Sequence, residues 1–520
     1  MRAVLAAAGL TSVHTDARTI ENGSLIEGDL CIVGAGAAGI TLARDWIGKG
    51  RRVLLLEGGG FDYDPRMQEL YRGEIVGLPY FPLQAARLHY FGGTTGHWAG
   101  FCSTLDPLDF EVRDWVPHSG WPITRSELDP YYARAVGIVQ VGPNEWTAAE
   151  WQRRDPALVP FALDPKVAWT KMWQFSAPAR FGTLYRDAIV GARDVHLYTH
   201  ANVVEVEVNG GASAVDALRV RTLEGKEHRV RASRYVLACS TIQNARLLLA
   251  SNRQMTVGVG NQNDLVGRFF MEHLEMPSGN LVTMGRTPPS THMYDFVFGR
   301  TKARGEIALS ADLQREQRIL NATVALEPAP LGEAGQSTFQ WATPDVVEHM
   351  RSDRVVPDTL AAPRAPRTFH LLTRQEQAPN PLSRVTLSPE RDALGMPRAR
   401  LDWRLTPLDR RSFRGFYEVL GRELGRAGIG RLQMNDWVME AADAPWPKSL
   451  GGGWHHMGTT RMHPDPKQGV VDVNCRVHGL ANLYIAGAAV YPTAGCVNPT
   501  LTLVALTLRL SDHLRRASAA

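Results

Sequence analysis

The sequence lacks the features that mark several large classes of protein. Its five cysteines are odd in number and include no C-x-x-C pair, so neither a disulfide framework nor a thiolate zinc site is expected. No stretch approaches the roughly 20 apolar residues that a membrane-spanning helix needs. Lys and Arg exceed Asp and Glu by only 57 − 53 = 4 and form no long basic run, which argues against nucleic-acid binding.

Few signals mark a destination outside the cytoplasm. Only one positive charge, that of Arg2, precedes a short apolar run over residues 3–10, and no clear cleavage-like stretch follows it. We therefore predict a cytoplasmic chain with no membrane span of its own. Such a chain could join a membrane complex only through another subunit.

The length and the bulk composition are those of a folded protein with two domains. At 520 residues the chain exceeds the size of one ordinary hydrophobic core. Apolar residues make up 44% of the chain and charged residues 21%, fractions typical of a globular protein rather than a disordered one. No internal repeat indicates a solenoid.

A strand, a glycine-rich turn, a helix and a second strand follow one another near the N-terminus. Residues 29–33 form an apolar, β-rich run, and residues 53–56 form a second one. Between them, residues 38–49 have apolar side chains at helical spacing and end at Gly50, a stop signal. This order is that of a βαβ unit, which places two parallel strands in one sheet.

The turn of this unit carries the pattern G-x-G-x-x-G at Gly34, Gly36 and Gly39. Gly34 permits the tight turn, Gly36 lets the backbone approach a pyrophosphate, and Gly39 lets the helix pack closely on the strand. The free N–H groups where the helix begins, near Ala38, attract the phosphates. Glu57 ends the next strand, 23 residues after Gly34, where a carboxylate can bind a ribose. FAD and NAD both fit these residues.

Further strands and helices follow from the same periodicity. Runs over 196–208 and 217–238 alternate as strands, and residues 236–249 lead from a strand into a helix. Short alternating runs at 384–387 and 398–403 indicate a hairpin. The remaining predicted elements are helices over 125–137, 407–427 and 498–514 and a strand over 482–486.

Two motifs near the C-terminus have both a structural and a chemical interpretation. His455 and His456 lie in a glycine-flanked loop without zinc-site spacing, so no metal is predicted. One packed and one exposed histidine would explain the pair, and so would a general base with a pKa near neutrality. Asn498 and Pro499 suit the start of a helix. A helix N-terminus also places polar groups and a dipole where a site gains negative charge.

Four blocks of the sequence, taken in order, resemble the glucose-methanol-choline (GMC) oxidoreductase family nearly from end to end. The blocks are residues 33–39 with 56–59, residues 92–100, residues 236–245, and residues 455–459 with 486–487 and 498–499. The family is FAD-dependent, so the resemblance implies FAD rather than NAD.

The resemblance also implies the architecture. It predicts an α/β fold with a Rossmann-type FAD-binding domain and an inserted α+β substrate domain whose sheet is mostly antiparallel. The predicted FAD-binding domain is discontinuous and comprises residues 24–150, 196–280 and 446–520. The predicted substrate domain comprises residues 151–195 and 281–445.

The resemblance assigns the catalytic roles. In the family, the His of the pattern His-x-x-Gly-Thr takes the hydroxyl proton, and the matching residue is His455 rather than His456. Asn498 matches the residue that hydrogen-bonds the substrate oxygen, in the Asn version of cholesterol oxidases and pyranose oxidases. Removal of the proton makes hydride departure from the adjacent C–H feasible, and flavin N5 accepts the hydride. We therefore expect His455 and Asn498 side by side over the flavin.

Residues 93–98 are similar to the branch that contains pyranose oxidase and the membrane fructose and gluconate dehydrogenases. In pyranose oxidase the matching histidine is joined covalently to the flavin, and His97 falls on it; a non-covalent histidine beside the ring is the alternative. Ala99 replaces a threonine whose hydroxyl would lie near N5, which weakens any transfer of oxygen reactivity. The other FAD-binding residues that the resemblance implies are Gly93, Thr94, Trp98, Val203, Gly487, Ala488, Asn498 and Pro499.

The function that the resemblance implies is oxidation of a CH–OH group, on a sugar, a glycoside or a polyol, to a carbonyl. Two alternatives stay open at this point. One is a lyase of the same fold that keeps FAD without redox chemistry, and the other is a flavin-bearing subunit that docks an electron-transfer partner. The sequence identifies neither the substrate nor the electron acceptor, which could be oxygen, a quinone or a cytochrome.

Overall fold

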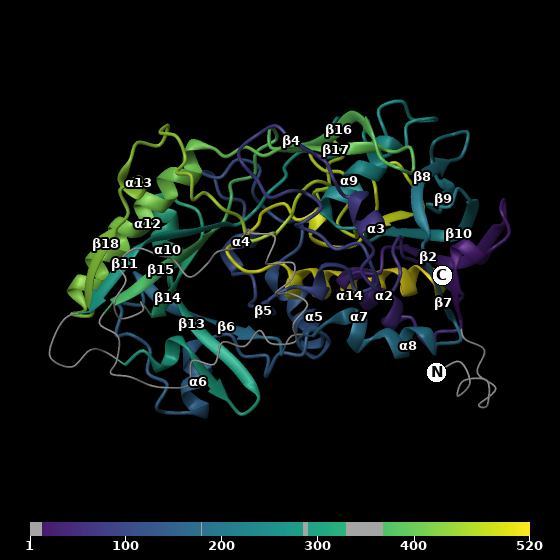
Figure 1. Cartoon of the computed structure of the whole chain (residues 1–520). Coiled ribbons are helices and arrows are strands. Elements are labelled where there is room, and N and C mark those ends of the chain that lie inside the picture. Colours follow the sequence, from purple (N-terminus) through teal and green to yellow (C-terminus); the bar gives the residue numbers. More distant parts are fainter. Residues whose placement is uncertain (1–12, 178, 284–289, 329–367, 520) are drawn as a thin grey trace.

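Two large sheets organise the chain (Figure 1). The computed structural model describes residues 13–177, 179–283, 290–328 and 368–519. In Figure 1 the first sheet lies at the right and the second extends to the left, with helix α14 (Thr500–Ala519) in the middle. The predicted α/β class, with one Rossmann-type sheet and one antiparallel sheet, is confirmed.

The first sheet is mainly parallel. Its strands, in spatial order, are β1 (His14–Asp16), β7 (Val195–Thr199), β3 (Val53–Leu56), β2 (Leu25–Val33), β10 (Glu227–Leu237), β9 (Val215–Arg221) and β8 (Asn202–Val208), and β19 (Leu483–Ile485) also pairs with β10. Only the β10–β9 and β9–β8 pairs are antiparallel. Strands β2 and β3 are apolar where they cross the middle of the sheet, because helices or loops cover both faces there.

The register of the parallel strands makes four of them end together. Val33 of β2 lies opposite Leu56 of β3 and Leu237 of β10, and Leu237 lies opposite Ile485 of β19. Parallel strands that end in register deliver the residues that follow them to one edge of the sheet. Segments from four distant parts of the sequence therefore meet at this edge.

Three helices cover one face of this sheet. Helix α14 packs against α2 (Ala37–Asp45) and α5 (Arg125–Ile138), and Figure 1 shows the three below the sheet, with α9 (Thr241–Ala250) above it. The helix predicted over 38–49 ends earlier, at Asp45, because the chain turns through two glycines with positive φ, Gly48 (+74°) and Gly50 (+66°).

The second sheet is antiparallel throughout its described pairs. Its order is β18 (Gly430–Met434), β11 (Leu274–Thr283), β15 (Thr368–Gln375), β14 (Ala322–Pro328), β13 (Thr301–Leu309), β6 (Ala168–Phe175) and β5 (Phe101–Cys102), with β12 (Phe296–Phe298) beside β13. Helix α12 (Pro407–Arg426) packs against β18. Residues from early, middle and late parts of the chain thus form one sheet.

The predicted hairpin forms, but not in the second sheet. Strands β16 (Arg384–Arg391) and β17 (Pro397–Asp402) pair with each other, and β17 also pairs with β4 (Glu74–Ile75). Their turn packs on α9, where Arg246 makes a buried ion pair with Asp392 at 2.6 Å. The division into domains stays a prediction, and these contacts lead us to propose that the hairpin belongs with the FAD-binding part and β11 with the substrate part.

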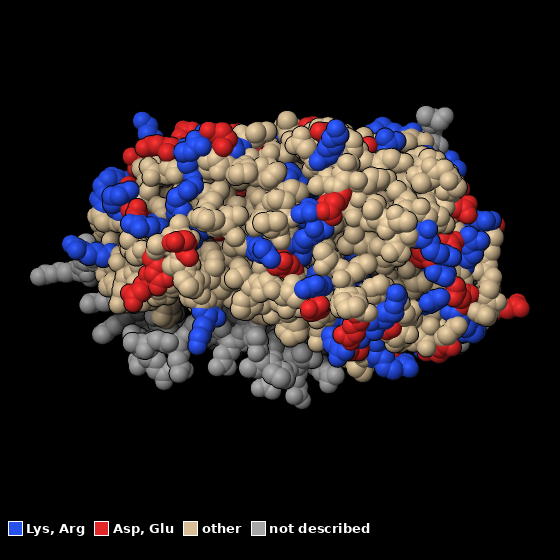
Figure 2. Space-filling view, turned by 90° about the horizontal axis from the view of Figure 1, so that it is seen from above, with Lys and Arg blue, Asp and Glu red and all other residues tan. Residues whose placement is uncertain are grey.

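Short elements complete the described chain. They are η1 (Ala17–Thr19), α3 (Pro65–Glu69), η2 (Gly93–Gly96), α4 (Pro107–Phe110), α6 (Ala148–Arg154), α7 (Phe181–Leu184), α8 (Arg186–Val190), η3 (His292–Tyr294), α10 (Ala311–Gln317), α13 (Asp436–Met439) and η4 (Ala488–Val490). Among the described residues, no helix is both long enough and apolar enough to cross a bilayer. On the face in Figure 2, acidic and basic side chains lie intermixed, without a broad patch of one sign.

Candidate active site

The glycine loop sits at the edge where the four strands end. Gly34 has φ of +98°, and its N–H donates to the carbonyl of Leu56 at 2.7 Å. A Cβ on Gly34 would lie 2.7 Å from the carbonyl oxygen of Ala238, and one on Gly39 would lie 1.8 Å from the carbonyl oxygen of Gly34. Gly36 differs, because its Cβ would meet no protein atom within 4 Å. The loop is therefore packed on two sides and open at Gly36, as close approach of a phosphate requires.

The loop around His97 docks directly on this glycine loop. The N–H of Gly92 donates to the carbonyl of Ala35 at 2.8 Å, and a Cβ on Gly93 would lie 3.1 Å from Cα of Gly36. Gly93 has φ of +52°, in the left-handed region that favours glycine. Two motifs almost sixty residues apart in the sequence thus form one surface, with Thr94 on the same short 3₁₀ turn.

Glu57 lies where the ribose contact was predicted, but its carboxylate is also engaged by the backbone. Its two oxygens accept the N–H groups of Ala35 and Gly59, each at 2.9 Å. Burial raises the pKa of Glu57 despite these bonds. The side-chain amide of Asn202 donates to the carbonyl of Gly58 at 3.2 Å. Val203 is the next residue, so it lies close to this edge of the sheet. The ribose contact of Glu57 and the adenine contact of Val203 stay predictions.

The two predicted catalytic side chains touch each other. Nδ2 of Asn498 lies 3.0 Å from Nε2 of His455. The other side of the amide, Oδ1, lies 3.2 Å from the indole Nε1 of Trp173. Because an indole N–H can only donate, Oδ1 must face Trp173 and the NH₂ group must face His455. Nε2 of His455 therefore accepts and carries no proton.

The hydrogen bonds on the opposite side of the His455 ring independently place its proton on Nδ1. Its Nδ1 lies 2.9 Å from Nδ1 of His273, whose Nε2 lies 2.9 Å from the carbonyl oxygen of Gly495. A carbonyl only accepts, so Nε2 of His273 is protonated and its Nδ1 is the acceptor. His455 must then donate from Nδ1. The hydrogen bonds run in one direction from Trp173 through Asn498, His455 and His273 to Gly495.

Asn498 is not the cap of the final helix. Helix α14 begins at Thr500, and the first helical N–H, that of Leu503, bonds to the carbonyl of Pro499 at 2.9 Å. The recorded hydrogen bonds of the Asn498 side chain go to Trp173 and His455 instead. The structural interpretation of Asn498 as an N-cap is therefore wrong, while the helix itself forms as predicted.

The neighbouring histidine has a packing role. Nε2 of His456 lies 2.8 Å from the hydroxyl of Tyr80, whose own hydroxyl hydrogen-bonds the carboxyl of Glu272. That carboxyl also accepts the backbone N–H groups of His455, at 2.7 Å, and His273, at 2.8 Å. Burial raises the pKa of Glu272 to about 7. One carboxyl thus pins both of the histidines that form the line of hydrogen bonds.

The electrostatic surroundings keep His455 neutral. Burial lowers its pKa well below 6.5, and the positive charge of Arg374 lowers it further. The nearest carboxylate, that of Glu275, lies 3.7 Å from Nδ1 and is held by Arg374 at 2.7 Å. A neutral imidazole with a free lone pair on Nε2 can take a proton from a hydroxyl group.

His97 extends from the glycine loops toward His455. Its ring stacks on Trp454, the neighbour of His455, with ring centroids 5.4 Å apart. Its Nε2 is buried and has no hydrogen-bond partner among the described residues, and burial lowers its pKa to about 4. Trp98 is held by its indole N–H, which donates to the carbonyl of Ala179 at 3.1 Å.

The arrangement of these residues fits FAD. Gly487 has φ of +121° and, like Gly36, open space where a Cβ would lie. The carbonyl of Ala488 accepts the N–H of Gly458 at 3.1 Å, which ties the loop of His455 to this segment. The open glycines at the strand edge would hold the pyrophosphate, and the loop that docks on them carries His97, whose Nε2 has no partner among the described residues. Pro499 directly follows Asn498, in the loop that leads into α14.

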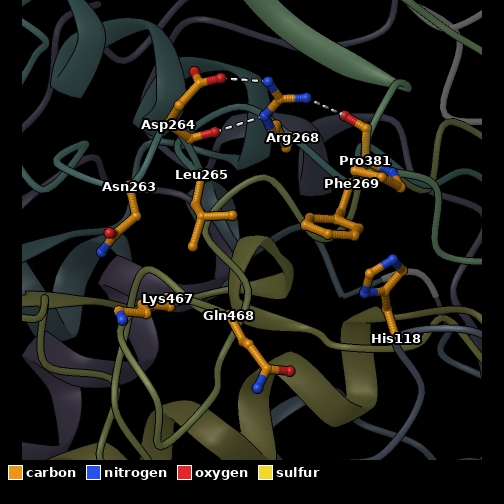
Figure 3. Close-up of a pocket in the computed structure, with 9 residues that line it drawn as sticks. All are labelled: His118, Asn263, Asp264, Leu265, Arg268, Phe269, Pro381, Lys467 and Gln468. Carbon is orange, nitrogen blue, oxygen red and sulfur yellow. Dashed lines mark hydrogen bonds and ion pairs between the residues drawn. The ribbon is translucent and has the colours of Figure 1, made fainter.

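A separate hollow of about 540 Å³ contains none of the predicted site residues (Figure 3). Arg268 closes one side of it, with bonds to the carboxylate of Asp264 and to the carbonyl of Pro381. His118 and Phe269 meet edge to face at another side. We assign no function to this hollow.

Comparison with known proteins identifies the family of the chain. Residues 29–370 match the family described as FAD dependent oxidoreductase, and residues 379–507 match the family described as GMC oxidoreductase. The chain belongs to the FAD-dependent GMC oxidoreductases. The resemblance drawn from the four sequence blocks is confirmed.

Several curated proteins are similar to this GMC oxidoreductase along nearly its whole length. It is 24% identical to 2-methyl-1,2-propanediol dehydrogenase of Mycolicibacterium austroafricanum, over 94% of this chain and 95% of that protein. It is 27% identical to 6'''-hydroxyparomomycin C oxidase of Streptomyces lividus (93% and 90%). It is 24% identical to the fructose dehydrogenase large subunit of Gluconobacter japonicus (94% and 98%).

Solved structures share the fold. Formate oxidase superposes with a TM-score of 0.58 at 15% identity, over 96% of this chain and 99% of that one. Pyridoxine 4-oxidase from Mesorbium loti gives a TM-score of 0.55 at 18% identity, over 94% and 99%. At these identities the likeness establishes the fold and not the substrate.

The glycine positions generate a prediction about cofactor binding. Gly36→Ala should leave the fold intact, because the added methyl group meets no protein atom, but it should weaken FAD binding because it fills the space of the pyrophosphate. Gly39→Ala is the contrast, since its methyl group would overlap the carbonyl of Gly34. FAD content per folded protein and the midpoint of thermal unfolding separate the two effects. Gly36→Ala protein with full FAD content would contradict the assignment.

Proposed function

We propose that this chain oxidises the CH–OH group of a polyhydroxylated alcohol to a carbonyl, with His455 as the base and Asn498 as its partner. The observation that carries the proposal is the directed line of hydrogen bonds that leaves Nε2 of His455 unprotonated against the amide of Asn498. A base must hold a lone pair at the point where the proton arrives, and this line of bonds provides it.

The chain's own residues accept the proton and orient the substrate. The substrate hydroxyl takes the place of the Asn498 amide at Nε2 of His455 and gives its proton to that nitrogen. The amide N–H then donates to the substrate oxygen and stabilises its developing negative charge. FAD supplies the acceptor for the hydride that leaves the adjacent carbon.

The substrate class follows from the relatives and stays a proposal. Their names give a propanediol, a hydroxyparomomycin and fructose as the compounds on which they act. Each is a molecule with more than one hydroxyl group or a sugar ring. Their names also divide between oxidases and dehydrogenases, so they favour no single electron acceptor.

A second candidate role is that of a flavin subunit in a dehydrogenase complex. One relative is named as the large subunit of a fructose dehydrogenase, and this chain covers 98% of it. The role adds an electron-transfer partner to the same chemistry. Flavin that is bleached by substrate but re-oxidised by a quinone or a cytochrome far faster than by air would favour it.

Removal of the base should stop flavin reduction and leave the cofactor in place. His455→Ala should slow anaerobic flavin bleaching by substrate by about 10²- to 10⁴-fold, with unchanged FAD content. His118→Ala, in the hollow of Figure 3, is the control and should bleach at the wild-type rate. Bleaching of His455→Ala at the wild-type rate would overturn the assignment.

The pH dependence should reflect the lowered pKa of His455. Since a lowered pKa keeps the active neutral form populated to lower pH, the rate of bleaching should stay constant down to pH 6.5 and fall only below it. Glu272→Gln is the control, because the pKa of that neighbouring carboxyl is about 7. A decline centred at or above pH 6.5 in both proteins would contradict a base of lowered pKa.

We also propose that His97 forms a covalent bond to a methyl group of the flavin through Nε2. One C–H bond of that methyl group and the N–H bond of the imidazole would break, and the flavin would take up the two electrons and later pass them to the electron acceptor. The buried, unpartnered Nε2 supports this proposal, as does the similarity of residues 93–98 to the pyranose oxidase branch. Acid-precipitated wild-type protein should then remain yellow, and precipitated His97→Ala should be colourless. A colourless wild-type pellet would exclude the bond and favour a non-covalent histidine beside the ring.

A further inference from the structure

We infer that His273 is a positioning residue for the reaction: it holds His455 in the one tautomer that can act as a base and shares the positive charge that forms there. The inference rests on the proposed function, because it assigns a partner to the proposed base. His273 immediately precedes β11, which lies between β18 and β15 in the second sheet, and its side chain is fully buried.

The contact between the two rings requires one proton and one lone pair. Both atoms are Nδ1, 2.9 Å apart, so one ring must donate and the other accept. The carbonyl of Gly495 decides which, because it can only accept and therefore fixes the proton of His273 on Nε2. His273 is thus an obligate acceptor for the Nδ1 proton of His455.

The other tautomer of His455 has no place in this arrangement. A proton on Nε2 would point at the NH₂ group of Asn498, whose orientation Trp173 fixes, so two donors would face each other. On the other side, the unprotonated Nδ1 of His455 would face the lone pair of His273. Both mismatches are largely buried, where polar groups without partners are costly.

His273 also couples the two catalytic loops. Its backbone N–H shares the carboxyl of Glu272 with the N–H of His455, and its ring bonds to Gly495, three residues before Asn498. Displacement of this ring would therefore disturb the loop of the base and the loop of its amide partner together.

The same ring stabilises the state after proton transfer. The substrate O–H bond breaks and its proton forms a bond to Nε2 of His455, so the ring becomes an imidazolium that donates from Nδ1 to His273. Glu275, 3.7 Å from Nδ1, faces the pair from β11, while Arg374 on β15 and the neutral His456 lie on the other sides. The carbonyl of Gly495 cannot take a proton, so the proton does not leave by this route.

Two substitutions at His273 separate positioning from packing. Leu fills the site but accepts no hydrogen bond, whereas the Oδ1 of Asn can accept from Nδ1 of His455. We expect His273→Leu to slow anaerobic flavin bleaching by about 10- to 100-fold, the range for losing a group that orients a ligating histidine. His273→Asn should recover most of the rate. FAD content and the thermal midpoint of both proteins check that they are folded.

The double variant His273→Leu with His455→Ala gives the decisive comparison. If His273 acts through His455, the double variant should bleach no more slowly than His455→Ala alone. Equal losses in the Leu and Asn variants, or a further loss in the double variant, would overturn the inference and leave a packing role. If no alcohol bleaches the wild-type flavin, the proposed function itself fails, which is a distinguishable outcome.

Discussion

The register of the parallel strands in the first sheet is the constraint on which the site depends. Val33, Leu56, Leu237 and Ile485 end their strands opposite one another, so the glycine loop, Glu57 and Gly487 reach the same edge of the sheet. Hydrophobic burial on both faces fixes this register, because a slip of one residue would turn every side chain to the other face. The cofactor platform is thus a consequence of core packing.

The second sheet supplies side chains that surround the proposed base, which the cofactor platform does not provide. Trp173 comes from β6, and His273 and Glu275 come from β11 and the residue before it, while His455 and Asn498 lie on loops that return from the end of the chain. The proposed base is therefore surrounded by groups from the second sheet and from the loops near the C-terminus. Because Trp173 and Gly495 each permit only one direction of hydrogen bonding, the protonation state at the centre is set by residues at the two ends of the line.

Much of the fold was predictable because it depends on local periodicity. The βαβ unit around Gly34, the helix that begins at Arg125 and the hairpin at 384–402 follow from hydrophobic spacing, glycines and a capping box, all of which act over a few residues. The end of α2 was predicted four residues too late, because the helical apolar spacing continues past Asp45 although the chain turns there.

The candidate site was predictable only in part. His455, Asn498 and the glycines came from the motifs that carry the family resemblance, and the structure places Nδ2 of Asn498 3.0 Å from Nε2 of His455. His273, Glu272 and Trp173 were missed, because single side chains in apolar or mixed stretches give no periodic signal of a partner more than 180 residues away. The sequence signal that could have found His273 is its position directly before a strand, after a carboxylate, within a buried run.

The most direct test of this account is a structure of the FAD-loaded chain with a bound alcohol or an unreactive analogue. The account predicts that Nε2 of His455 and Nδ2 of Asn498 both lie about 2.6–3.2 Å from the same hydroxyl oxygen, next to the flavin ring. Nδ1 of His455 should still face His273 in that complex. A hydroxyl oxygen bound out of reach of both nitrogens, or a His455 ring turned away from His273, would contradict the account.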